Sequence, residues 1–554
     1  MTEQQQFTLR IEGLTCEGCA RHVISALQDV PGIEEVRVGD WKEGRATVIS
    51  GTKVSAEQLS RTVAEAGYRA IVEGTRPLKL GTRVPKGRDS DFDLVIIGGG
   101  SAAFAASIRA AEMGARVAMV EQGTIGGTCV NVGCVPSKTL IKAAEVCYHA
   151  SYSNFKGMAA CPPPSEWQTV LNQKDELVAA LREKKYVNVL KANPNVSLIR
   201  GRAELAGGRG VRVGEREYRA GKIIIATGSH SFIPPISGLK ATAFLDSEAA
   251  LSLPALPKTL IVIGSGSIGL ELSQLFARFG VSVTLLEAAH RIAPVEEPEI
   301  SAALTGYLQQ EKLAVRAGLS VERVDIKDGE YRVQITNGSG SEVLTAQQLL
   351  VSTGRRANTS GFGLEAAGVE LGPKGEIKVD RHLRTTNPDI YAAGDCIGDP
   401  MYVYVAAYAG GLAAENAITE GGTLYDLSAL PRVTFTDPQI ASVGMTEVQA
   451  HEAGLDYEIS ILPLEQMPRA QASRNTKGLF KLIRERGTAR LIGAHILAAE
   501  AGEVIQEATL AIRFKLTTKD IINTFHPYLT MAEGMKLTAL TFSKDVEQLS
   551  CCAA

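Results

Sequence analysis

The chain of 554 residues is long enough for three or four domains at about 100–200 residues each. Its 58 Lys and Arg residues nearly balance 61 Asp and Glu, and the net charge of −3 gives no electrostatic reason to expect nucleic acid or an anionic membrane as a partner. The sequence has no apolar run near the about 20 residues of a membrane-spanning helix, and it shows no secretion-signal pattern. We therefore expect a cytoplasmic protein without membrane insertion.

Residues 1–72 predict a small module with the ferredoxin-like order βαββαβ. Strands are expected at 7–13, at 35–50 (two strands) and at 68–72, and helices at 20–30 and 55–66. A pair of thiols, Cys16 and Cys19, falls between the first strand and the first helix, where the helix dipole favours thiolate. Two thiolates suit a soft ion such as Cu(I) or Hg(II), whereas a closed zinc site needs four ligands.

This module resembles the heavy-metal-associated domains, whose GMTCxxC motif it matches with Leu14 in place of Met. An inert pair or a thioredoxin-type redox pair is the alternative.

Residues 73–90 contain two Pro and three Gly, are basic and show no period, which predicts a flexible linker. A tethered metal site would act at a raised effective concentration.

A dinucleotide fingerprint begins after the expected buried strand at 93–97. The turn contains Gly98, Gly100 and Ala103 in the pattern GxGxxA, and Glu121 ends the next strand. Such glycines let the backbone approach a pyrophosphate at a helix N terminus, and the acid can bind a ribose. We expect a dinucleotide site here.

A second copy follows the expected strand at 260–263. It is formed by four residues: Gly264, Gly266, Gly269 and Glu287. Two fingerprints indicate two dinucleotides, for which FAD and a nicotinamide cofactor are the economical pair. Glu287 fits the unphosphorylated ribose of NADH, because a 2′-phosphate needs a cation, so both NADPH and NADH stay open.

Residues 126–138 read GGTCVNVGCVPSK, with Cys129 and Cys134 five apart directly after the first fingerprint. A static bridge is the alternative to a redox pair. The motif resembles the signature GGTCxNxGCxPSK of the pyridine nucleotide-disulfide oxidoreductases, such as glutathione reductase and lipoamide dehydrogenase. Further matches at 226–228, 352–355 and 385–395 extend the similarity over roughly 91–545.

The resemblance implies an α/β fold with two Rossmann-like domains and an α+β dimerisation domain. The FAD domain is expected at 91–240 with a return at 371–430, the NAD(P)H domain at 241–370, and the dimerisation domain at 431–554. Cys134 would lie against the flavin, with Cys129 as the outer, exchanging thiol. The resemblance also implies an ion pair of Lys138 with Glu271 near the flavin and FAD contacts at five residues: Gly123, Thr128, Ala203, Asp395 and Val403.

The sequence departs from the family pattern at two positions expected near the reacting groups. Disulfide-reducing members carry an acid-base His five residues before a Glu. Here Tyr528 lies five before Glu533 and His526 lies seven before it, so a phenol replaces the His unless the alignment follows His526. Many relatives also place a Tyr over the nicotinamide where this chain has Ser267.

The C-terminal tail contains Cys551 and Cys552, and adjacent thiolates can pass a soft ion between sites. Idle thiols or a tail redox relay are the alternatives. With the other cysteine pairs and Tyr528, the tail makes the chain similar to the mercury-reducing branch of the family.

The resemblance to this branch implies a function. Hg(II), arriving as a thiol complex, would be reduced to Hg(0) with electrons from NAD(P)H through FAD and the Cys129/Cys134 pair. The three cysteine pairs would bind the metal, the tail would act on the other subunit of a homodimer, and mercury-delivering proteins are possible partners. A lipoamide dehydrogenase-like dithiol oxidoreductase and a soft-metal chaperone are the alternatives.

Overall fold

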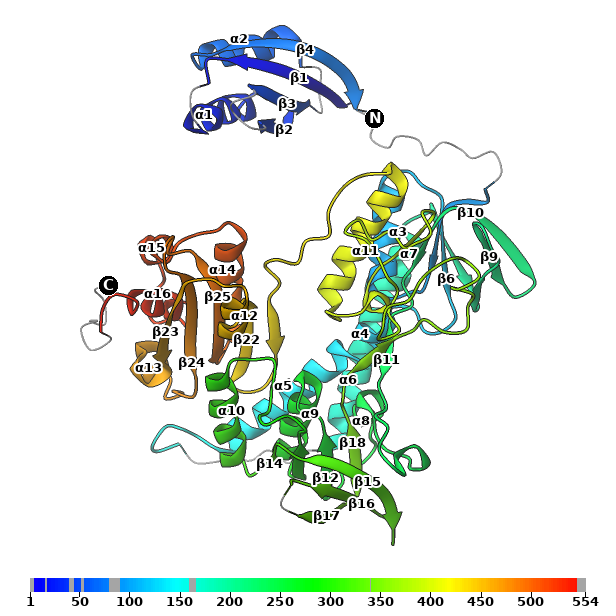
Figure 1. Cartoon of the computed structure of the whole chain (residues 1–554), viewed down its shortest axis with the longest axis vertical. Coiled ribbons are helices and arrows are strands. Elements are labelled where there is room, and N and C mark those ends of the chain that lie inside the picture. Colours follow the sequence, from blue (N-terminus) through cyan, green and yellow to red (C-terminus); the bar gives the residue numbers. More distant parts are fainter. Residues whose placement is uncertain are drawn as a thin grey trace.

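The structure is a computed structural model, and it describes residues 4–14, 17–38, 44–50, 54–78, 90–158, 166–338 and 340–545. Figure 1 shows four units along the chain. Cys16, Cys161, Cys551 and Cys552 lie outside the described residues. Within those ranges, we find no helix with the length and apolar character that crossing a bilayer requires.

The N-terminal unit is a four-stranded antiparallel sheet with two helices, as expected from the βαββαβ pattern. Its strand order is β2-β3-β1-β4. The elements are β1 (Gln4–Glu12), α1 (Glu17–Gln28), β2 (Ile33–Val38), β3 (Arg45–Ser50), α2 (Ala56–Glu65) and β4 (Arg69–Leu78). Ser55 caps α2 by accepting a hydrogen bond from the Gln58 amide at 3.1 Å. Alternate β1 residues Phe7, Leu9 and Ile11 are buried in the core.

The predicted linker 73–90 is wrong over its first residues. Strand β4 continues to Leu78, and residues 74–78 pair with residues 4–8 of β1. Gly74 and Pro77 hide the strand pattern in the sequence. An edge strand such as β4 tolerates proline, because one of its sides has no ladder to complete.

The FAD-type unit has a parallel sheet in the order β7-β6-β5-β10-β20, and β9 pairs antiparallel with β10 while β8 pairs antiparallel with β9. Its elements are β5 (Phe92–Ile97), α3 (Ser101–Glu112), β6 (Val117–Glu121), α4 (Gly127–Asn131), α5 (Cys134–Ser151), α6 (Trp167–Arg182), η2 (Glu183–Val187), α7 (Asn188–Lys191), β7 (Val196–Arg200), β8 (Ala203–Leu205), β9 (Gly210–Val213), β10 (Arg216–Ile225), β11 (Ser229–Ser231), β19 (Arg355–Ala357), β20 (Ile390–Ala392), η4 (Asp395–Ile397) and α11 (Val403–Thr419). Helices α3 and α11 pack together against this sheet.

The second Rossmann-like unit has the parallel order β14-β13-β12-β18 and a three-stranded antiparallel sheet β15-β16-β17. Its elements are η3 (Leu239–Ala241), α8 (Ser247–Ala250), β12 (Thr259–Ile263), α9 (Ser267–Arg278), β13 (Ser282–Leu286), α10 (Pro298–Gln310), β14 (Ala314–Arg316), β15 (Ser320–Lys327), β16 (Glu330–Thr336), β17 (Ser341–Ala346) and β18 (Gln348–Val351). Parallel strands buried on both faces explain the uninterrupted apolar runs of the sequence.

The predicted end of this unit at residue 370 is too late. Phe362, Leu364 and Val369 are buried in one cluster with Val95 of the FAD-type sheet. The chain therefore leaves the second unit after β18, and residues 355–370 belong by packing to the first. Gly354, Gly361 and Gly363 lie in this turn-rich segment, but turn residues alone do not show which of the two cores the chain packs against.

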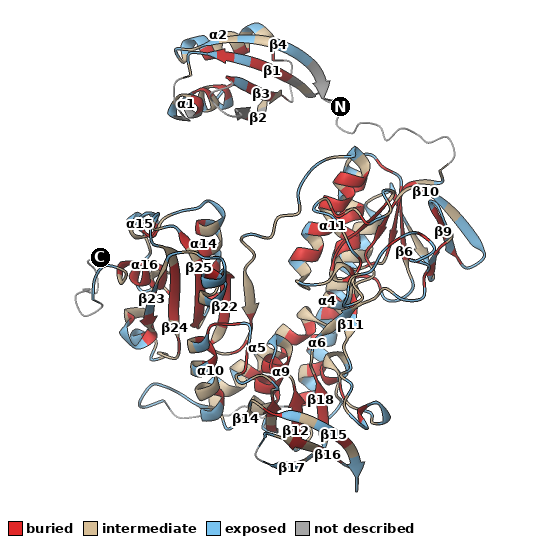
Figure 2. Cartoon of the chain, in the orientation of Figure 1, coloured by how far each residue is buried: buried red, intermediate tan, exposed pale blue. Residues whose placement is uncertain are grey.

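The C-terminal unit is a five-stranded antiparallel sheet in the order β21-β22-β25-β24-β23, flanked by helices. Its elements are β21 (Arg432–Thr434), β22 (Gln439–Gly444), α12 (Glu447–Glu452), β23 (Tyr457–Pro463), η5 (Leu464–Gln466), α13 (Pro468–Ala472), β24 (Leu479–Glu485), β25 (Leu491–Ala498), α14 (Ala501–Arg513), α15 (Thr518–Asn523) and α16 (Glu533–Leu540). Figure 2 shows the central strands buried along their length. The mixed α+β unit expected here is confirmed.

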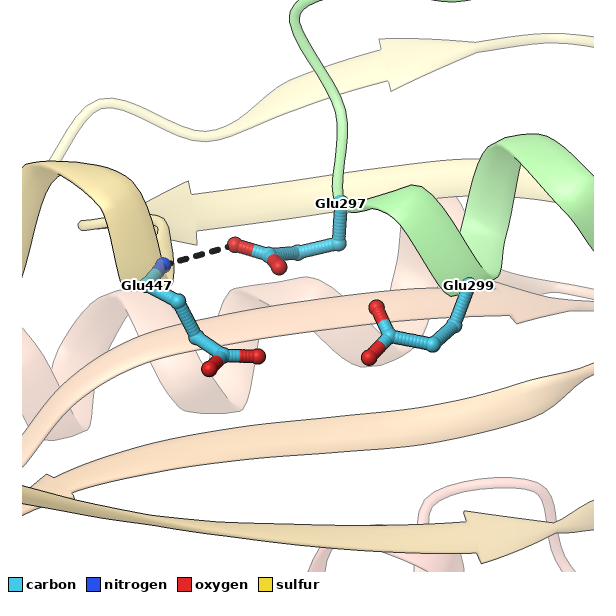
Figure 3. A group of neighbouring side chains, drawn as sticks. All are labelled: Glu297, Glu299 and Glu447. Atoms are coloured by element: carbon cyan, nitrogen blue, oxygen red, sulfur yellow. Dashed lines mark hydrogen bonds between the residues drawn. The ribbon is translucent and has the colours of Figure 1, made fainter. Parts of the chain in front are cut away.

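An ionic cluster joins the C-terminal unit to the second Rossmann-like unit. Figure 3 shows Glu297 and Glu299 at the start of α10 and Glu447 at the start of α12 with converging carboxylates. The ammonium of Lys481, fully buried on β24, lies 2.8 Å from Glu297 and from Glu299 and also bonds Glu447. This lysine is the cation that the three carboxylates surround, so the cluster is not proposed as a metal site.

Candidate functional site

The first fingerprint forms a backbone cradle that only glycine permits. Gly98 follows β5 with φ +121°, and a Cβ there would lie 2.2 Å from the carbonyl oxygen of Ala226. A Cβ on Gly127, φ +64°, would lie 2.6 Å from the Cα of Gly100. Gly100 is also the N-cap of α3, so backbone N–H groups at a helix N terminus point to the space between these turns.

The second fingerprint repeats this construction after β12. Gly264 has φ +101°, and a Cβ there would lie 2.6 Å from the carbonyl oxygen of Ser352. Gly266 is the N-cap of α9. A Cβ on Gly269 would lie 1.9 Å from the carbonyl oxygen of Gly264, so glycine is required for the helix to pack this closely on the turn.

One cavity of about 1550 Å³ contains both turns and the two cysteines. This volume exceeds the about 300–1,000 Å³ of a site for one drug-sized ligand, so the cavity has room for two extended ligands. The predicted residues that line it are Gly98, Gly100, Glu121, Gly123, Thr128, Cys129, Cys134, Lys138, Gly264, Gly266, Glu271, Glu287, Asp395 and Val403. The glycine cradles fit the pyrophosphates of FAD and a nicotinamide nucleotide.

Three predicted cofactor residues are buried and do not line the cavity. Ala103 and Gly269 occupy the third positions of the two fingerprints, where the requirement is close helix packing. Ala203 is buried on β8, and its contact with FAD stays a prediction.

Two carboxylates end the second strands of the two Rossmann-like folds. Glu121 accepts a hydrogen bond from the Gly123 amide at 2.5 Å. Glu287 accepts bonds from the amide and hydroxyl of Ser265, at 2.9 and 2.6 Å, and from the Ala289 amide at 2.8 Å. These bonds hold both carboxylates in the cavity wall, where their remaining lone pairs can accept ribose hydroxyls.

The two cysteines form a coupled pair of free thiols at the start of neighbouring helices. Cys129 is the third residue of α4 and Cys134 the first residue of α5. A hydrogen bond from Cys129 and, more weakly, the ammonium of Lys138 lower the pKa of Cys134 to about 7, against the effect of burial. The same hydrogen bond, together with burial, raises the pKa of Cys129. Cys134 is thus the thiolate of the pair near neutral pH.

Lys138, one turn after Cys134 on α5, forms a 2.6 Å ion pair with Glu271 on α9. Glu271 also accepts a hydrogen bond from the Phe435 amide at 2.9 Å, and the Lys138 ammonium lies 4.7 Å from the Phe435 ring centroid. The Lys138–Glu271 pair therefore connects α5, which carries Cys134, to the second Rossmann-like unit and to the C-terminal unit. The ion pair implied by the family resemblance is present.

Lys138→Met should raise the pKa of Cys134, because the variant loses the nearby positive charge that stabilises the thiolate. Alkylation of the reduced pair by iodoacetamide, followed by mass spectrometry of the peptide, should show its midpoint near pH 7 in the native chain and at higher pH in the variant. Lys142→Met, one turn further along the same helix and paired with Glu145, is the matched control. An unchanged midpoint in Lys138→Met would contradict this assignment.

The sequence reasoning missed the residues that orient Asp395. Its carboxylate accepts a 2.6 Å hydrogen bond from the hydroxyl of Ser229, which in turn accepts one from Arg355 at 2.8 Å. All three line the cavity. An arginine directly after a buried strand and a Gly turn was the available signal for Arg355, because such a side chain emerges at the carboxyl edge of a parallel sheet.

Two tyrosines in the cavity wall also escaped the sequence analysis. The rings of Tyr402 and Tyr404 stack with centroids 5.4 Å apart, and the Tyr404 hydroxyl donates to the carbonyl of Pro431 at 2.6 Å. Burial raises the pKa of both phenols. Nearby, Ser267, where many relatives have a Tyr, shares a 2.7 Å hydrogen bond with Thr434. Val403 in the run MYVYV was predicted to contact FAD, but nothing in the sequence distinguished the two tyrosines on either side of it.

The structure does not bring Tyr528 and Glu533 to the cavity within one subunit. Neither residue lines the cavity: Tyr528 is half exposed in the segment between α15 and α16, and Glu533 begins α16. His526 is held at 2.8 Å by Glu507 on α14 and does not pair with Glu533 in the structure. This geometry favours the alignment that places Tyr528 in the acid-base position of disulfide-reducing relatives.

Comparisons with protein families match three segments of the chain. Residues 8–69 match the heavy-metal-associated domain, residues 92–410 the pyridine nucleotide-disulphide oxidoreductases, and residues 430–539 the dimerisation domain of that family. The family implies FAD and a nicotinamide nucleotide as cofactors, which agrees with the two glycine cradles.

Comparisons with individual proteins cover nearly the whole chain. It is 42% identical over 550 residues to the mercuric reductase of Staphylococcus aureus, covering 99% of this chain and 100% of that protein. It is also 42% identical over 559 residues to the mercuric reductase of Acidithiobacillus ferrooxidans, covering 100% of each. Among solved structures, it resembles the HOCl-induced flavoprotein disulfide reductase RclA of Escherichia coli, with a TM-score of 0.73 and 30% identity over 82% of this chain and 100% of that one. The chain belongs to the pyridine nucleotide-disulphide oxidoreductases and, among them, to the mercuric reductases.

Proposed function

We propose that the chain is an enzyme that reduces Hg(II) to Hg(0) with two electrons from a nicotinamide nucleotide. The observation that carries this proposal is the Cys129/Cys134 pair, which lies in one cavity with both glycine cradles and has its thiolate at Cys134. The match to mercuric reductases over the full chain supports the substrate. The overall reaction converts NAD(P)H and Hg(II) into NAD(P)⁺, Hg(0) and one proton.

The chain's residues prepare a two-ligand site for the metal. The first glycine cradle would hold FAD, which would supply the two-electron transfer between the nucleotide and the cysteine pair. The Cys134 thiolate displaces one external thiolate from Hg(II), and Cys129 displaces the second as its proton passes to that leaving thiolate. Lys138 stabilises the thiolate state, and Glu271 holds Lys138 in place.

A second group of residues would act from the other subunit of a homodimer. The dimerisation domain supports a dimer, in which Tyr528 and Glu533 would face the partner's cavity. Tyr528 would line the path of the metal, because a departing metal atom needs no acid-base His. Cys551 and Cys552 of the tail would hand Hg(II) to Cys129 and Cys134 of the partner subunit.

The N-terminal unit would collect the metal for this relay. Cys19 lies half-buried at the start of α1 beside a helix N terminus, and Cys16 completes the CxxC pair of the sequence. The match to heavy-metal-associated domains supports this role. We place the protein in the cytoplasm, where a reducing environment keeps the thiols free, and consider mercury-delivering proteins possible partners.

We further propose that NADH is accepted at least as well as NADPH. Glu287 is fixed by three hydrogen bonds at the end of β13, where its charge would repel a 2′-phosphate. Among the residues that the structure describes, Arg355 and Lys138 are the cations of the cavity wall; Arg355 is engaged with Ser229 and Lys138 with Glu271. The cavity wall around Glu287 thus offers a ribose acceptor and no cation for a phosphate.

Glu287→Gln should raise the preference for NADPH over NADH by about tenfold, because one repelled charge corresponds to roughly 1.4 kcal/mol or more at a partly buried site. The ratio of kcat/KM values for the two nucleotides measures this change. Glu330→Gln, at the exposed first residue of β16, is the charge-matched control and should leave the ratio unchanged. A native enzyme that strongly prefers NADPH would contradict the proposal.

Anaerobic nucleotide oxidation by the purified holoenzyme tests the proposed function. Oxidation should depend on Hg(II) supplied in excess small thiol and should release volatile mercury, whereas lipoamide should support little turnover. The double variant Cys551→Ala, Cys552→Ala should lose most Hg(II) turnover while its flavin is still reduced by the nucleotide. Turnover with lipoamide but not with Hg(II) would instead indicate a dithiol oxidoreductase. Metal binding without any turnover would indicate a soft-metal chaperone.

A further inference from the structure

His526 lies buried in a short segment between α15 and α16 that exposes aromatic side chains. Its side chain is 4% exposed, whereas Phe525 beside it is 98% exposed and Tyr528 is 50% exposed. Leu529 has φ +62°, a left-handed conformation that packing or hydrogen bonding must hold. A buried imidazole therefore anchors a segment whose neighbouring side chains face outward.

Both ring nitrogens of His526 face hydrogen-bond acceptors. Nε2 lies 2.8 Å from a carboxylate oxygen of Glu507 on α14, and Nδ1 lies 3.0 Å from the backbone oxygen of Thr524. A carbonyl oxygen and an ionised carboxylate can only accept, while a neutral imidazole has a single N–H. The observed geometry satisfies both contacts only when the ring is an imidazolium.

The charged groups around the ring favour this protonated state. Glu507 faces it from α14, and Glu533 and Lys536 face it from α16. The hydrogen bond to Glu507 raises the pKa of His526, against the smaller effects of burial and Lys536. Burial raises the pKa of Glu533, whose Oε2 is buried without a hydrogen-bond partner in the described chain, and the charge of His526 opposes that rise.

We propose that His526 is a positioning residue which, as an imidazolium, ties residues 524–530 to α14 and so fixes Tyr528 for the mercury reaction. This inference rests on the proposed function, in which Tyr528 lines the path of the metal. It assigns His526 a role different from the proton transfer of disulfide-reducing relatives. The ring is committed to Glu507 and Thr524 and has no nitrogen left for a thiol.

The proposal has a definite pH dependence. The folded-state pKa of His526 is raised above the ordinary value of about 6.5, so the positioning contribution is complete below pH about 6.5. As the pH rises through the folded-state pKa, the neutral ring keeps only one of its two hydrogen bonds. The segment then loses its tie to α14 or to Thr524.

The test compares kcat/KM for Hg(II) in the native holoenzyme and in His526→Gln from about pH 6 to about pH 9. Glutamine can donate to Glu507 but never carries a charge. The ratio of native to variant values should be several-fold at low pH and should approach one at high pH. Using the ratio cancels the titration of the cysteine pair, which both proteins share. Reduction of the flavin by the nucleotide alone should be equal in both at every pH.

Two further variants separate positioning from other roles. Glu507→Gln keeps a hydrogen-bond acceptor but removes the charge, so the alkaline fall should move to lower pH. In a Tyr528→Phe background, His526→Gln should cause no further loss, because its effect passes through Tyr528. A ratio independent of pH, or an undiminished loss in that background, would overturn the inference.

These outcomes differ from a failure of the proposed function. If the native enzyme showed no Hg(II)-dependent oxidation at any pH, the proposed function itself would fall. Thermal unfolding of the native chain and His526→Gln over the same pH range would still test the ion pair. The difference in midpoint should be largest at low pH and vanish at high pH, and a constant difference would count against the imidazolium.

Discussion

Cys134→Ala should reduce Hg(II)-dependent nucleotide oxidation by at least about a thousandfold, as expected when the nucleophile of a covalent or metal-transfer step is removed. The thiolate with a pKa of about 7 would be absent, and Cys129 alone offers one ligand with a raised pKa. The glycine cradles are untouched, so reduction of the bound flavin by the nucleotide should stay within about twofold. Stopped-flow absorbance of the flavin and steady-state oxidation measure the two steps separately.

Cys147→Ala is the matched control for this substitution. Cys147 lies on the same helix α5 and is a half-buried free thiol that does not line the cavity. Its replacement should change neither step. Loss of flavin reduction in Cys134→Ala would show that the substitution damages the cofactor site, and retained mercury turnover would refute the role of the pair.

The second large effect is expected on stability. Lys481→Met should destabilise the chain by about 3–5 kcal/mol, because removing one partner leaves a buried charge uncompensated. Burial alone would lower the pKa of Lys481, but its hydrogen bonds to Glu297, Glu299 and Glu447 raise it, so the ammonium is charged in the cluster. Met retains most of the side-chain volume of Lys. The loss of stability would therefore measure the effect of removing the positive charge.

Urea unfolding followed by tryptophan fluorescence checks this prediction. Trp167 packs in the hydrophobic core to which α10, the helix that carries Glu299, also contributes. Lys142→Met removes an exposed pair with Glu145 and should cost only about 0–1 kcal/mol. Adding Glu297→Gln to Lys481→Met should restore part of the loss, because one buried carboxylate disappears. A Lys481→Met chain as stable as the native one would show that the cluster contributes little.

The outcome of the sequence-based predictions depended on how local each signal was. The helix expected from residue 55 and the two fingerprint turns are local patterns, and the structure has them where the sequence placed them. The segment 73–78 misled, because pairing with β1 overrides its Gly and Pro content. The predicted domain boundary at residue 370 was wrong for the same reason. Phe362 packs against the FAD-type sheet, and the local sequence does not indicate this tertiary contact.

The sequence by itself determined the glycine turns, the order of the four units and the spacing of Cys129 and Cys134, because backbone conformation and thiol chemistry depend on residue type over a few positions. Only the tertiary structure decided which distant charges meet. His526 meets Glu507 rather than Glu533, and Lys481 meets its three glutamates. Partners far apart along the chain are brought together by the packing of whole units, and no local pattern specifies which of many carboxylates will be nearest.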